Sequence, residues 1–308
     1  MIEIKNVKLN IDNIDILNDI SFKVEDNSVT CILGNKNSGK SSLLKLIAGV
    51  YEDYYGEVIY DGKYINEIKN IEIDLVEDNR EKDDDITVVE YLQFYGAIYN
   101  KMQTDELNAY IDKMLKQFSL MSYKYTNINL LENENYKLVD LIRVSINDSK
   151  VLLLDNLFSS ENMEFNEKLF EYIKTLIGKK TIIFASRNLS YIEEIVDNIG
   201  ILETGNLIEY GKKNDIYRKA GLSNRIEIEL IDGIGEAIEL LKQNENIANI
   251  VYNDNLISFS LITNMAYQAA RNELENEILK KLIENNIKVY SFRKQGVRFK
   301  QLFEKIRG

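Results

Sequence analysis

The stretch Gly34-Asn35-Lys36-Asn37-Ser38-Gly39-Lys40-Ser41 has the spacing G-x-x-x-x-G-K-[ST] of a phosphate-binding loop. An apolar strand predicted at Thr30–Leu33 enters this loop, and a helix predicted from about Lys40 to Ala48 follows it. Such loops surround phosphate oxygens with backbone N–H groups, and the helix N-terminus adds the positive end of its dipole. Lys40 is expected to reach the β- and γ-phosphates of a nucleotide, and Ser41 to offer its hydroxyl to Mg²⁺.

The predicted nucleotide contacts extend one residue beyond the motif: Gly34, Asn35, Lys36, Asn37, Ser38, Gly39, Lys40, Ser41 and Ser42. The alternative is a chance glycine–lysine turn. Asn37 stands where glycine is common, and asparagine tolerates a left-handed backbone better than most residues. A second element supports the loop: the apolar run Leu152–Leu154 ends in Asp155, which is expected to hold Mg²⁺ through water.

Composition limits the class of protein. The 308 residues are 45% hydrophobic, which favours two domains over one. A formal net charge of −12 disfavours general nucleic-acid binding, so no nucleic-acid partner is expected. The chain has no histidine, which excludes histidine catalysis and histidine metal ligation, and its single cysteine, Cys31, is expected in the core. Since no apolar run reaches about 18 residues, no membrane span is expected, and any membrane role would need a partner.

Strands and helices alternate through most of the first 218 residues, so we predict an α/β fold with a mainly parallel sheet covered on both faces. Between about residues 85 and 147 the apolar spacing becomes helical, which predicts a helical subdomain. Strands are predicted at Ile2–Leu9, Ile20–Val24, Thr30–Leu33, Gly56–Tyr60, Val151–Leu154, Thr181–Ala185, Ile199–Glu203 and Leu207–Tyr210. Further helices are predicted at Phe165–Ile177 and Tyr191–Val196.

The last part of the chain has a different pattern. From residue 222 to 308 the predicted order is β-α-β-β-α-β, followed by a helix near Phe299–Ile306. This order is typical of a small α+β domain of the ferredoxin-like type. We therefore predict two domains, a nucleotide-binding domain at 1–218 and an accessory domain at 222–308.

With these motifs in place, the chain resembles the ATPases of ABC transporters, specifically the drug- and bacteriocin-exporter subunits. The resemblance includes Ile20-Ser21-Phe22 before the loop, Leu43–Gly49 after it, the segment Ile86–Leu92, and the C-terminal Val297–Phe303. It implies a P-loop NTPase fold, ATP and Mg²⁺ as cofactors, a separate membrane permease, and a second ATPase subunit in a homo- or heterodimer. It also implies a cytoplasmic protein held on the inner face of the membrane through the permease.

The same resemblance exposes departures at the positions that carry hydrolysis. Asn156 stands where the family has a general-base glutamate, and Arg187 stands at the switch histidine. The signature L-S-G-G-Q is replaced by Leu131-Glu132-Asn133-Glu134-Asn135. The sensor glutamine is replaced by Asp78 or Glu77, and Asp78 joins Ser41 and Asp155 as a candidate metal ligand.

The adenine-stacking aromatic of the family falls near Ile11, with Tyr51, Tyr54 and Tyr55 close by in sequence. We expect these tyrosines to pack in the core or lie on the surface.

The sequence therefore favours an ATP-binding exporter subunit with weak or absent hydrolysis. Two alternatives remain open. The chain could serve an active transporter in which a second, intact ATPase subunit hydrolyses ATP. It could also be a non-enzymatic regulatory or scaffold protein that does not depend on nucleotide.

Overall fold

The computed structural model describes residues 1–67, 72–78, 85–158, 162–187, 192–220, 225–261, 268–295 and 302. The chain divides into two compact units, Met1–Ile216 and Tyr217–Gly308. The predicted domain limits at residues 218 and 222 stay a prediction. In the described part of the chain, no helix combines the length and apolar character needed to cross a membrane.

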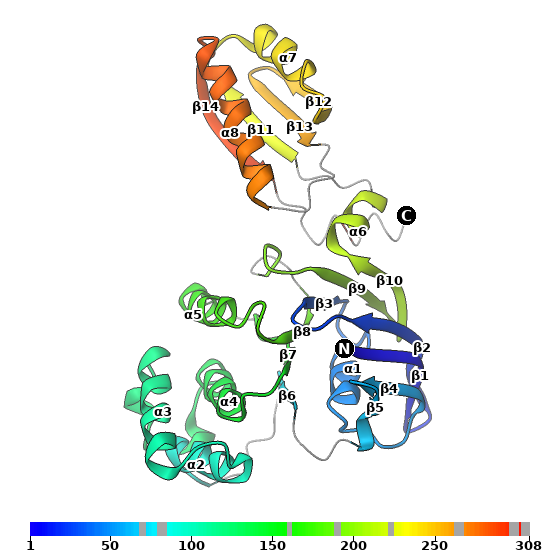
Figure 1. Ribbon diagram of the computed structural model, residues 1–308, viewed down its shortest axis with the longest axis vertical. Helices are drawn as coiled ribbons and strands as arrows, with labels where there is room; N and C mark the ends of the chain where they lie inside the picture. The colour runs from blue at the N-terminus through cyan, green and yellow to red at the C-terminus, as the bar shows by residue number, and fades with distance from the viewer. Residues whose placement is uncertain are drawn as a thin grey trace. The chain divides into compact units, whose positions relative to one another are not determined.

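A six-stranded sheet forms the centre of the first unit, in the order β10-β9-β3-β8-β7-β6 (Figure 1). Neighbours from β9 to β6 pair in parallel, and β10 pairs antiparallel with β9 at the edge. Every residue of β3, β7 and β8 is buried, which explains their apolar sequences. The strands are β3 (Val29–Leu33), β6 (Ile73–Val76), β7 (Val151–Asp155), β8 (Thr181–Ser186), β9 (Asn198–Glu203) and β10 (Asn206–Lys212).

A second, antiparallel sheet has the order β2-β1-β4-β5. Its strands are β1 (Ile2–Ile11), β2 (Ile14–Val24), β4 (Tyr55–Tyr60) and β5 (Lys63–Tyr64). Helix α1 (Lys40–Ile47) lies between the two sheets, since Leu43, Leu46 and Ile47 share one core with β1 and β2 and with Leu153 and Ile183 of the parallel sheet. Cys31 is buried as predicted, and burial raises the pKa of its thiol.

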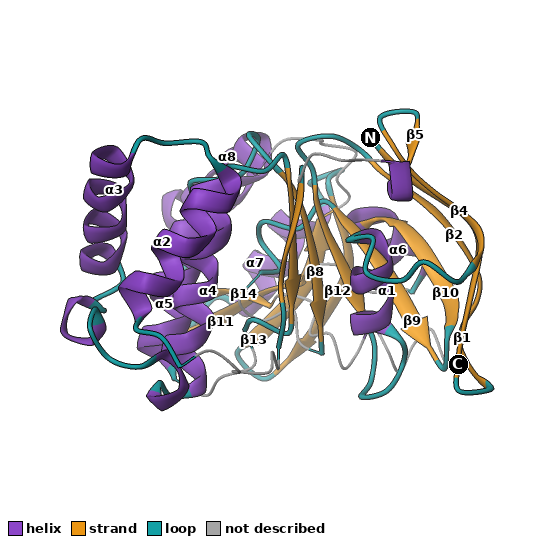
Figure 2. Cartoon of the chain, turned by 90° about the horizontal axis from the view of Figure 1, so that it is seen from below, coloured by secondary structure: helices purple, strands orange, loops and turns teal. Residues whose placement is uncertain are grey.

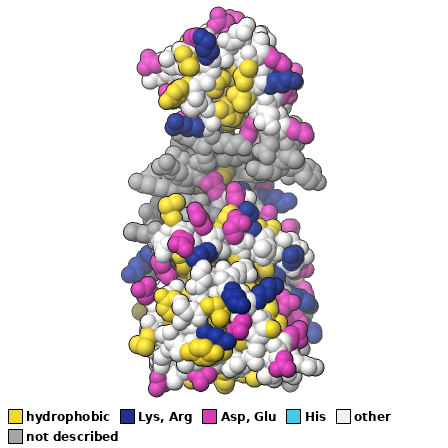
Figure 3. Space-filling view, turned by 90° about the vertical axis from the view of Figure 1, so that its left-hand side faces the viewer, with side chains coloured by type: hydrophobic (Ala, Val, Ile, Leu, Met, Phe, Trp, Pro, Cys, Tyr) yellow, Lys and Arg dark blue, Asp and Glu magenta, His cyan; other side chains and the backbone are white. Residues whose placement is uncertain are grey.

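Helices α2 (Val88–Tyr99), α3 (Thr104–Gln117), α4 (Asn133–Asn147) and α5 (Met163–Lys174) gather on one side of the parallel sheet (Figure 2). The predicted helical segment is therefore present. Helix α2 begins at Thr87 because a capping box with Glu90 satisfies its first backbone N–H groups. Seen from this side, the surface carries scattered hydrophobic side chains among charged ones (Figure 3).

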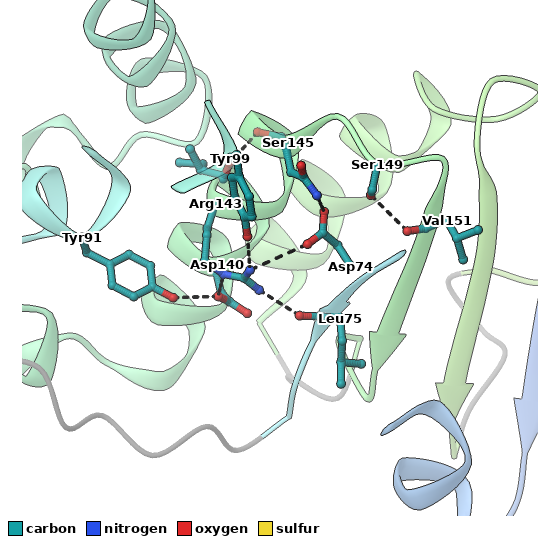
Figure 4. A network of polar contacts seen from close by, with 11 residues as sticks. Asp74, Leu75, Tyr91, Tyr99, Asp140, Arg143, Ser145, Ser149 and Val151 are labelled. Atoms are coloured by element: carbon teal, nitrogen blue, oxygen red, sulfur yellow. Dashed lines mark hydrogen bonds and ion pairs between the residues drawn. The ribbon is translucent and has the colours of Figure 1, made fainter. Parts of the chain in front are cut away.

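A buried polar network ties the helical segment to the sheet (Figure 4). Arg143 of α4 donates from Nε to Asp140 Oδ1 at 2.5 Å, from Nη1 to the Tyr99 hydroxyl at 2.7 Å, and from Nη2 to the Leu75 carbonyl at 2.9 Å. Burial raises the pKa of Asp74, while Arg143 and an Asn147 amide bond at 2.8 Å oppose the rise. Each buried charge in this network thus has a partner of opposite sign or a hydrogen bond.

The second unit holds β11 (Arg225–Leu230), α7 (Ile234–Lys242), β12 (Ile247–Asn253), β13 (Leu256–Leu261), α8 (Gln268–Glu284) and β14 (Val289–Gln295). The sheet is antiparallel in the order β12-β13-β11-β14. Ile226, Ile228 and Phe259 on the sheet pack with Leu241 of α7 and Ile278 of α8. The predicted fold class, a P-loop NTPase fold plus a ferredoxin-like α+β unit, is confirmed.

One local prediction is wrong, two elements were not predicted, and one predicted helix is not tested. Strand β6 and helix α6 (Lys213–Lys219) are present but were not predicted. The predicted helix at Tyr191–Val196 was wrong over its described residues, which form turns, because the Asp197 N–H already bonds to Val29 O and β9 begins at Asn198. The predicted helix at Phe299–Ile306 lies outside the described residues except for Leu302.

We predict that Arg143→Ala lowers the free energy of unfolding by about 3–5 kcal/mol, because it leaves the buried Asp74 and Asp140 without their cation. The measurement is equilibrium denaturation in urea. The control is Lys174→Ala, which removes an exposed ion pair to Glu171 and is expected to cost at most about 0.5 kcal/mol. Equal losses in the two variants would contradict a structural role for the network.

Candidate nucleotide site

The candidate site lies where parallel strands end. Strand β3 leads into residues 34–41, β7 into Asn156, β8 into Arg187 and β6 into Glu77 and Asp78. Because β3, β8, β7 and β6 are consecutive and parallel, these carboxyl-terminal residues share one edge of the sheet. Ligands of open α/β sheets bind outside this edge. The structure thus brings together most of the site residues predicted from the sequence.

Lys40 is the buried centre of the phosphate loop. Its Nζ donates to Gly34 O at 2.9 Å, Asn35 O at 2.7 Å and Ser38 Oγ at 3.2 Å. Asn35, Lys36 and Asn37 are exposed. The ammonium group therefore lies within the curve of the loop, where a bound phosphate could take over bonds that the loop carbonyls now accept.

The loop's two glycines have no room for a side chain. A Cβ on Gly34 would lie 2.3 Å from Leu202 O, and one on Gly39 would lie 2.9 Å from Ile16 O. Gly39 also has φ of 98°, a left-handed conformation. Asn37 has φ of 63°, the conformation for which the sequence favoured asparagine or glycine.

The predicted metal ligands Ser41 and Asp155 lie close together at this edge. The Ser41 side chain lies close enough to the Asp155 carboxylate to affect its pKa. Burial raises the pKa of Asp155, and the Ser41 hydroxyl opposes this rise. Burial lowers the pKa of Lys40; Asp155 opposes the shift and Arg187 adds to it, so Arg187 lies close enough to act on Lys40.

These residues fit Mg²⁺ bound together with a nucleotide. Mg²⁺ usually takes one or two carboxylates and completes its shell with substrate phosphates and water. Among the residues that the structure describes, no three Asp, Glu or Cys side chains form a closed metal site. Ser41 and Asp155 would therefore supply the protein ligands beside the phosphates, and the metal would neutralise phosphate charge.

Asp78 and Asn156 are part of a triad completed by a residue that the sequence did not single out, Lys137 of α4. Lys137 Nζ lies 2.6 Å from Asp78 Oδ1 and 3.2 Å from Asn156 O, and Asn156 Nδ2 donates to Asp78 Oδ2 at 2.7 Å. The available signal was a lysine within the amphipathic pattern of a helix that begins within the segment Leu131–Asn135. Both oxygens of the predicted metal ligand Asp78 thus accept hydrogen bonds from protein groups. Its role toward Mg²⁺ stays a prediction.

The remaining predicted positions lie in other surroundings. Glu132 occupies the N-cap of α4, and Glu134 in its first turn accepts a hydrogen bond from Asn162 Nδ2 at 2.8 Å. Ile11, Tyr51 and Tyr54 are partly buried and pack against the core, and Tyr55 is exposed. The three tyrosines thus lie in the core or on the surface, as expected.

Comparison with known proteins agrees with this geometry. Residues 17–159 match the profile of a family described as "ABC transporter". An uncharacterized ABC transporter ATP-binding protein of Methanocaldococcus jannaschii is 31% identical over 219 residues, which cover 71% of this chain and 80% of that protein. The chain belongs to the ABC transporter ATP-binding family. The spermidine/putrescine import ATP-binding protein PotA of Clostridium novyi is 26% identical over 273 residues, covering 82% of this chain and 78% of that protein.

Solved ABC cassettes have the same fold as the first unit. The ATP-binding subunit of an ABC transporter matches 72% of this chain and 94% of its own with a TM-score of 0.64 and 19% identity. A dimeric ATP-binding cassette described as bound to ADP and Pi after hydrolysis matches 69% of this chain and 98% of its own with a TM-score of 0.61 and 19% identity. The prediction of ATP and Mg²⁺ as cofactors is confirmed at the level of this ABC family.

We predict that Gly39→Ala destabilises the protein more than Gly62→Ala. Both glycines have positive φ, at 98° and 78°, but only Gly39 has atoms within 4 Å of the place that an added methyl group would occupy. The shared backbone strain is expected to cost about 1–2 kcal/mol in each variant. Urea denaturation of both measures the difference, and equal losses would show that the loop relaxes around the methyl group.

Proposed function

We propose that this ABC protein is the ATP-binding subunit of a transporter, that it holds Mg·ATP at residues 34–42, and that it has weak or absent intrinsic hydrolysis. The proposal rests on a difference between two sets of residues at one edge of the parallel sheet: those for binding are present, and the one for taking a proton is replaced. The groups that bind phosphate and metal, Lys40 and the Ser41–Asp155 pair, are arranged for binding. The adjacent Asn156, at the position of the general base, has no group that can take a proton.

Binding is favoured by the charge within the loop. Lys40 is buried with its ammonium group against two carbonyls and one hydroxyl, all of which are weaker partners than a phosphate oxygen. Arg187 adds a second cation close enough to act on Lys40, and its guanidinium can pair with a γ-phosphate. The site thus gathers positive charge within a chain of net charge −12.

Hydrolysis is disfavoured because proton-transfer groups are missing. The Asn156 side chain donates to Asp78, and an amide cannot deprotonate water. General-base catalysis contributes about 10²–10⁴-fold, so this loss alone removes most of the turnover. Arg187, at the position of the switch histidine, cannot act as a proton relay.

A second ATPase subunit fits this arrangement as a partner. In the dimer that the family resemblance implies, the segment Leu131–Asn135 faces the partner's γ-phosphate. Glu132 and Glu134 would bring carboxylates toward that charge, which is repulsive in a desolvated interface. We therefore propose that any strong hydrolysis in the assembled complex depends on an intact partner subunit.

The proposed coupling surface for a separate permease is the helical segment. This segment exposes several large apolar side chains, which do not contribute to its own core and could contact a partner: Phe94, Ile98, Tyr125 and Leu130. Figure 3 views this side and shows its apolar side chains separated by charged ones. Docking there would place the chain on the inner face of the cell membrane.

We propose export as the direction of transport, on the resemblance of Val297–Phe303 to exporter subunits. The clostridial relative is named for import. Inside-out vesicles that carry the complex and a candidate substrate distinguish the two directions. ATP-dependent accumulation in them is the expected result, and accumulation only in right-side-out vesicles would contradict export.

We predict that calorimetric titration detects binding of Mg·ATP to the purified chain, and that Lys40→Ala reduces the affinity at least about tenfold, because it removes the ammonium at the phosphates. The control is Lys63→Ala, which changes an exposed lysine on β5 outside the site. Incubation should yield no more ADP with the wild type than with Lys40→Ala. Equal affinity in wild type and Lys40→Ala would contradict the proposal and favour the scaffold alternative.

A further inference from the structure

Lys137 is a buried cation at the same sheet edge as the phosphate loop. The residue is only 2% exposed, and its ammonium lies between a carboxylate and a carbonyl, at 2.6 Å from Asp78 Oδ1 and 3.2 Å from Asn156 O. It reaches this edge from α4, one turn beyond the helix start. A lysine is rarely buried without a functional or structural reason, because its charge loses hydration.

The surrounding groups are held in place by the chain. Asn156 has φ of 48°, and its N–H donates to Ala185 O at 2.8 Å, which fixes the turn after β7. Asp78 is held from both sides, by Lys137 at one oxygen and by Asn156 Nδ2 at the other. The triad therefore joins α4, the segment after β6 and the end of β7.

The triad also acts on the phosphate site electrostatically. The pKa of Asp155 is raised by Asp78 as a like charge and lowered by Lys40 and Lys137 as opposite charges. Without Lys137, the negative charge of Asp78 would be uncompensated near Asp155 and hence near the candidate phosphate site. Like charges at short range in a partly desolvated site repel strongly.

We propose that Lys137 is a specificity-determining residue that makes the site favour a nucleoside triphosphate over a diphosphate. Its ammonium balances Asp78 and provides positive charge for the γ-phosphate, which a diphosphate lacks. This inference rests on the proposed function, namely nucleotide binding at residues 34–42. It adds a third cation, from the helical segment, to Lys40 and Arg187.

The experiment is calorimetric titration with Mg·ATP and with Mg·ADP, with the ratio of the two affinities as the readout. Three variants are compared with the wild type: Lys137→Gln, Asp78→Asn and the control Lys124→Gln. Lys124 forms an ion pair with Asp112 of the same 2.6 Å length in the helical segment, so it controls for loss of such a pair. Thermal unfolding confirms that each variant is folded.

The two site variants break the same ion pair but are expected to act in opposite directions. Lys137→Gln should lower the preference for ATP at least about tenfold, because it leaves Asp78 uncompensated. Asp78→Asn should keep or raise that preference, because it removes a negative charge near the phosphate site and keeps the positive charge of Lys137. Lys124→Gln should leave the ratio within about twofold, as is expected for a remote pair.

A loss of ATP preference shared by Lys137→Gln and Asp78→Asn would overturn the inference, since it would show that the ion pair acts only through structure. A wild type that binds both nucleotides equally, with affinity lost in Lys40→Ala, would leave the proposed function standing and overturn the role of Lys137. Absence of binding to either nucleotide would overturn both. If Lys137→Gln fails to fold, the Asp78→Asn ratio decides, and a fall in that ratio contradicts the inference.

Discussion

The parallel pairing of β3, β8, β7 and β6 is the constraint on which the nucleotide site depends. Residues far apart in the sequence, Lys40 and Arg187 among them, reach one place only because their strands run in the same direction and end at the same edge. A reversed strand would place its terminal residue at the opposite edge. The buried apolar faces of β3 and β7 fix this arrangement, since both sides of each strand must be covered.

Charge at this edge is balanced locally although the chain as a whole is acidic. Lys40 lies against loop carbonyls and within reach of Asp155, Lys137 is paired with Asp78, and Lys45 binds Glu77 at 2.9 Å. Pairing keeps these carboxylates from repelling an incoming phosphate. An acidic protein can therefore hold a polyanion, because the field at the site is set by the nearest groups rather than by the net charge.

Helix α4 connects the site with the helical segment at two levels. Near its start, Lys137 holds Asp78 after β6, and further along, Arg143 binds the Leu75 carbonyl of β6 itself. Arg143 also donates a hydrogen bond to the Tyr99 hydroxyl of α2, so β6 is linked through Arg143 to both α4 and α2 (Figure 4). A displacement of α4 would consequently change the contacts that Lys137 makes with Asp78 and Asn156. This connection gives the proposed permease-docking segment a direct physical route to the nucleotide.

Features that depend on residues close together in the chain could be predicted without the structure. The phosphate loop, the apolar strands on either side of it and the left-handed turn at Asn37 all follow from residues that are neighbours in the chain. The β-α-β-β-α-β order of the second unit likewise follows from local periodicity. In contrast, β6 was not predicted. Its four residues are stabilised as a strand by hydrogen bonds to β7, which lies far along the chain, so the local sequence carries little signal.

The contacts between side chains that are distant in the sequence became known only from the folded chain. The sequence marked Asp78, Asp155 and Asn156 one by one, and the parallel sheet placed them at one edge. No local pattern indicated that Lys137 would lie between Asp78 and the Asn156 carbonyl, or that Arg143 would bind Asp74 and Leu75. Such contacts depend on how α4 packs across β6 and β7, and that packing is set by the combined fit of apolar surfaces that are distant in the chain.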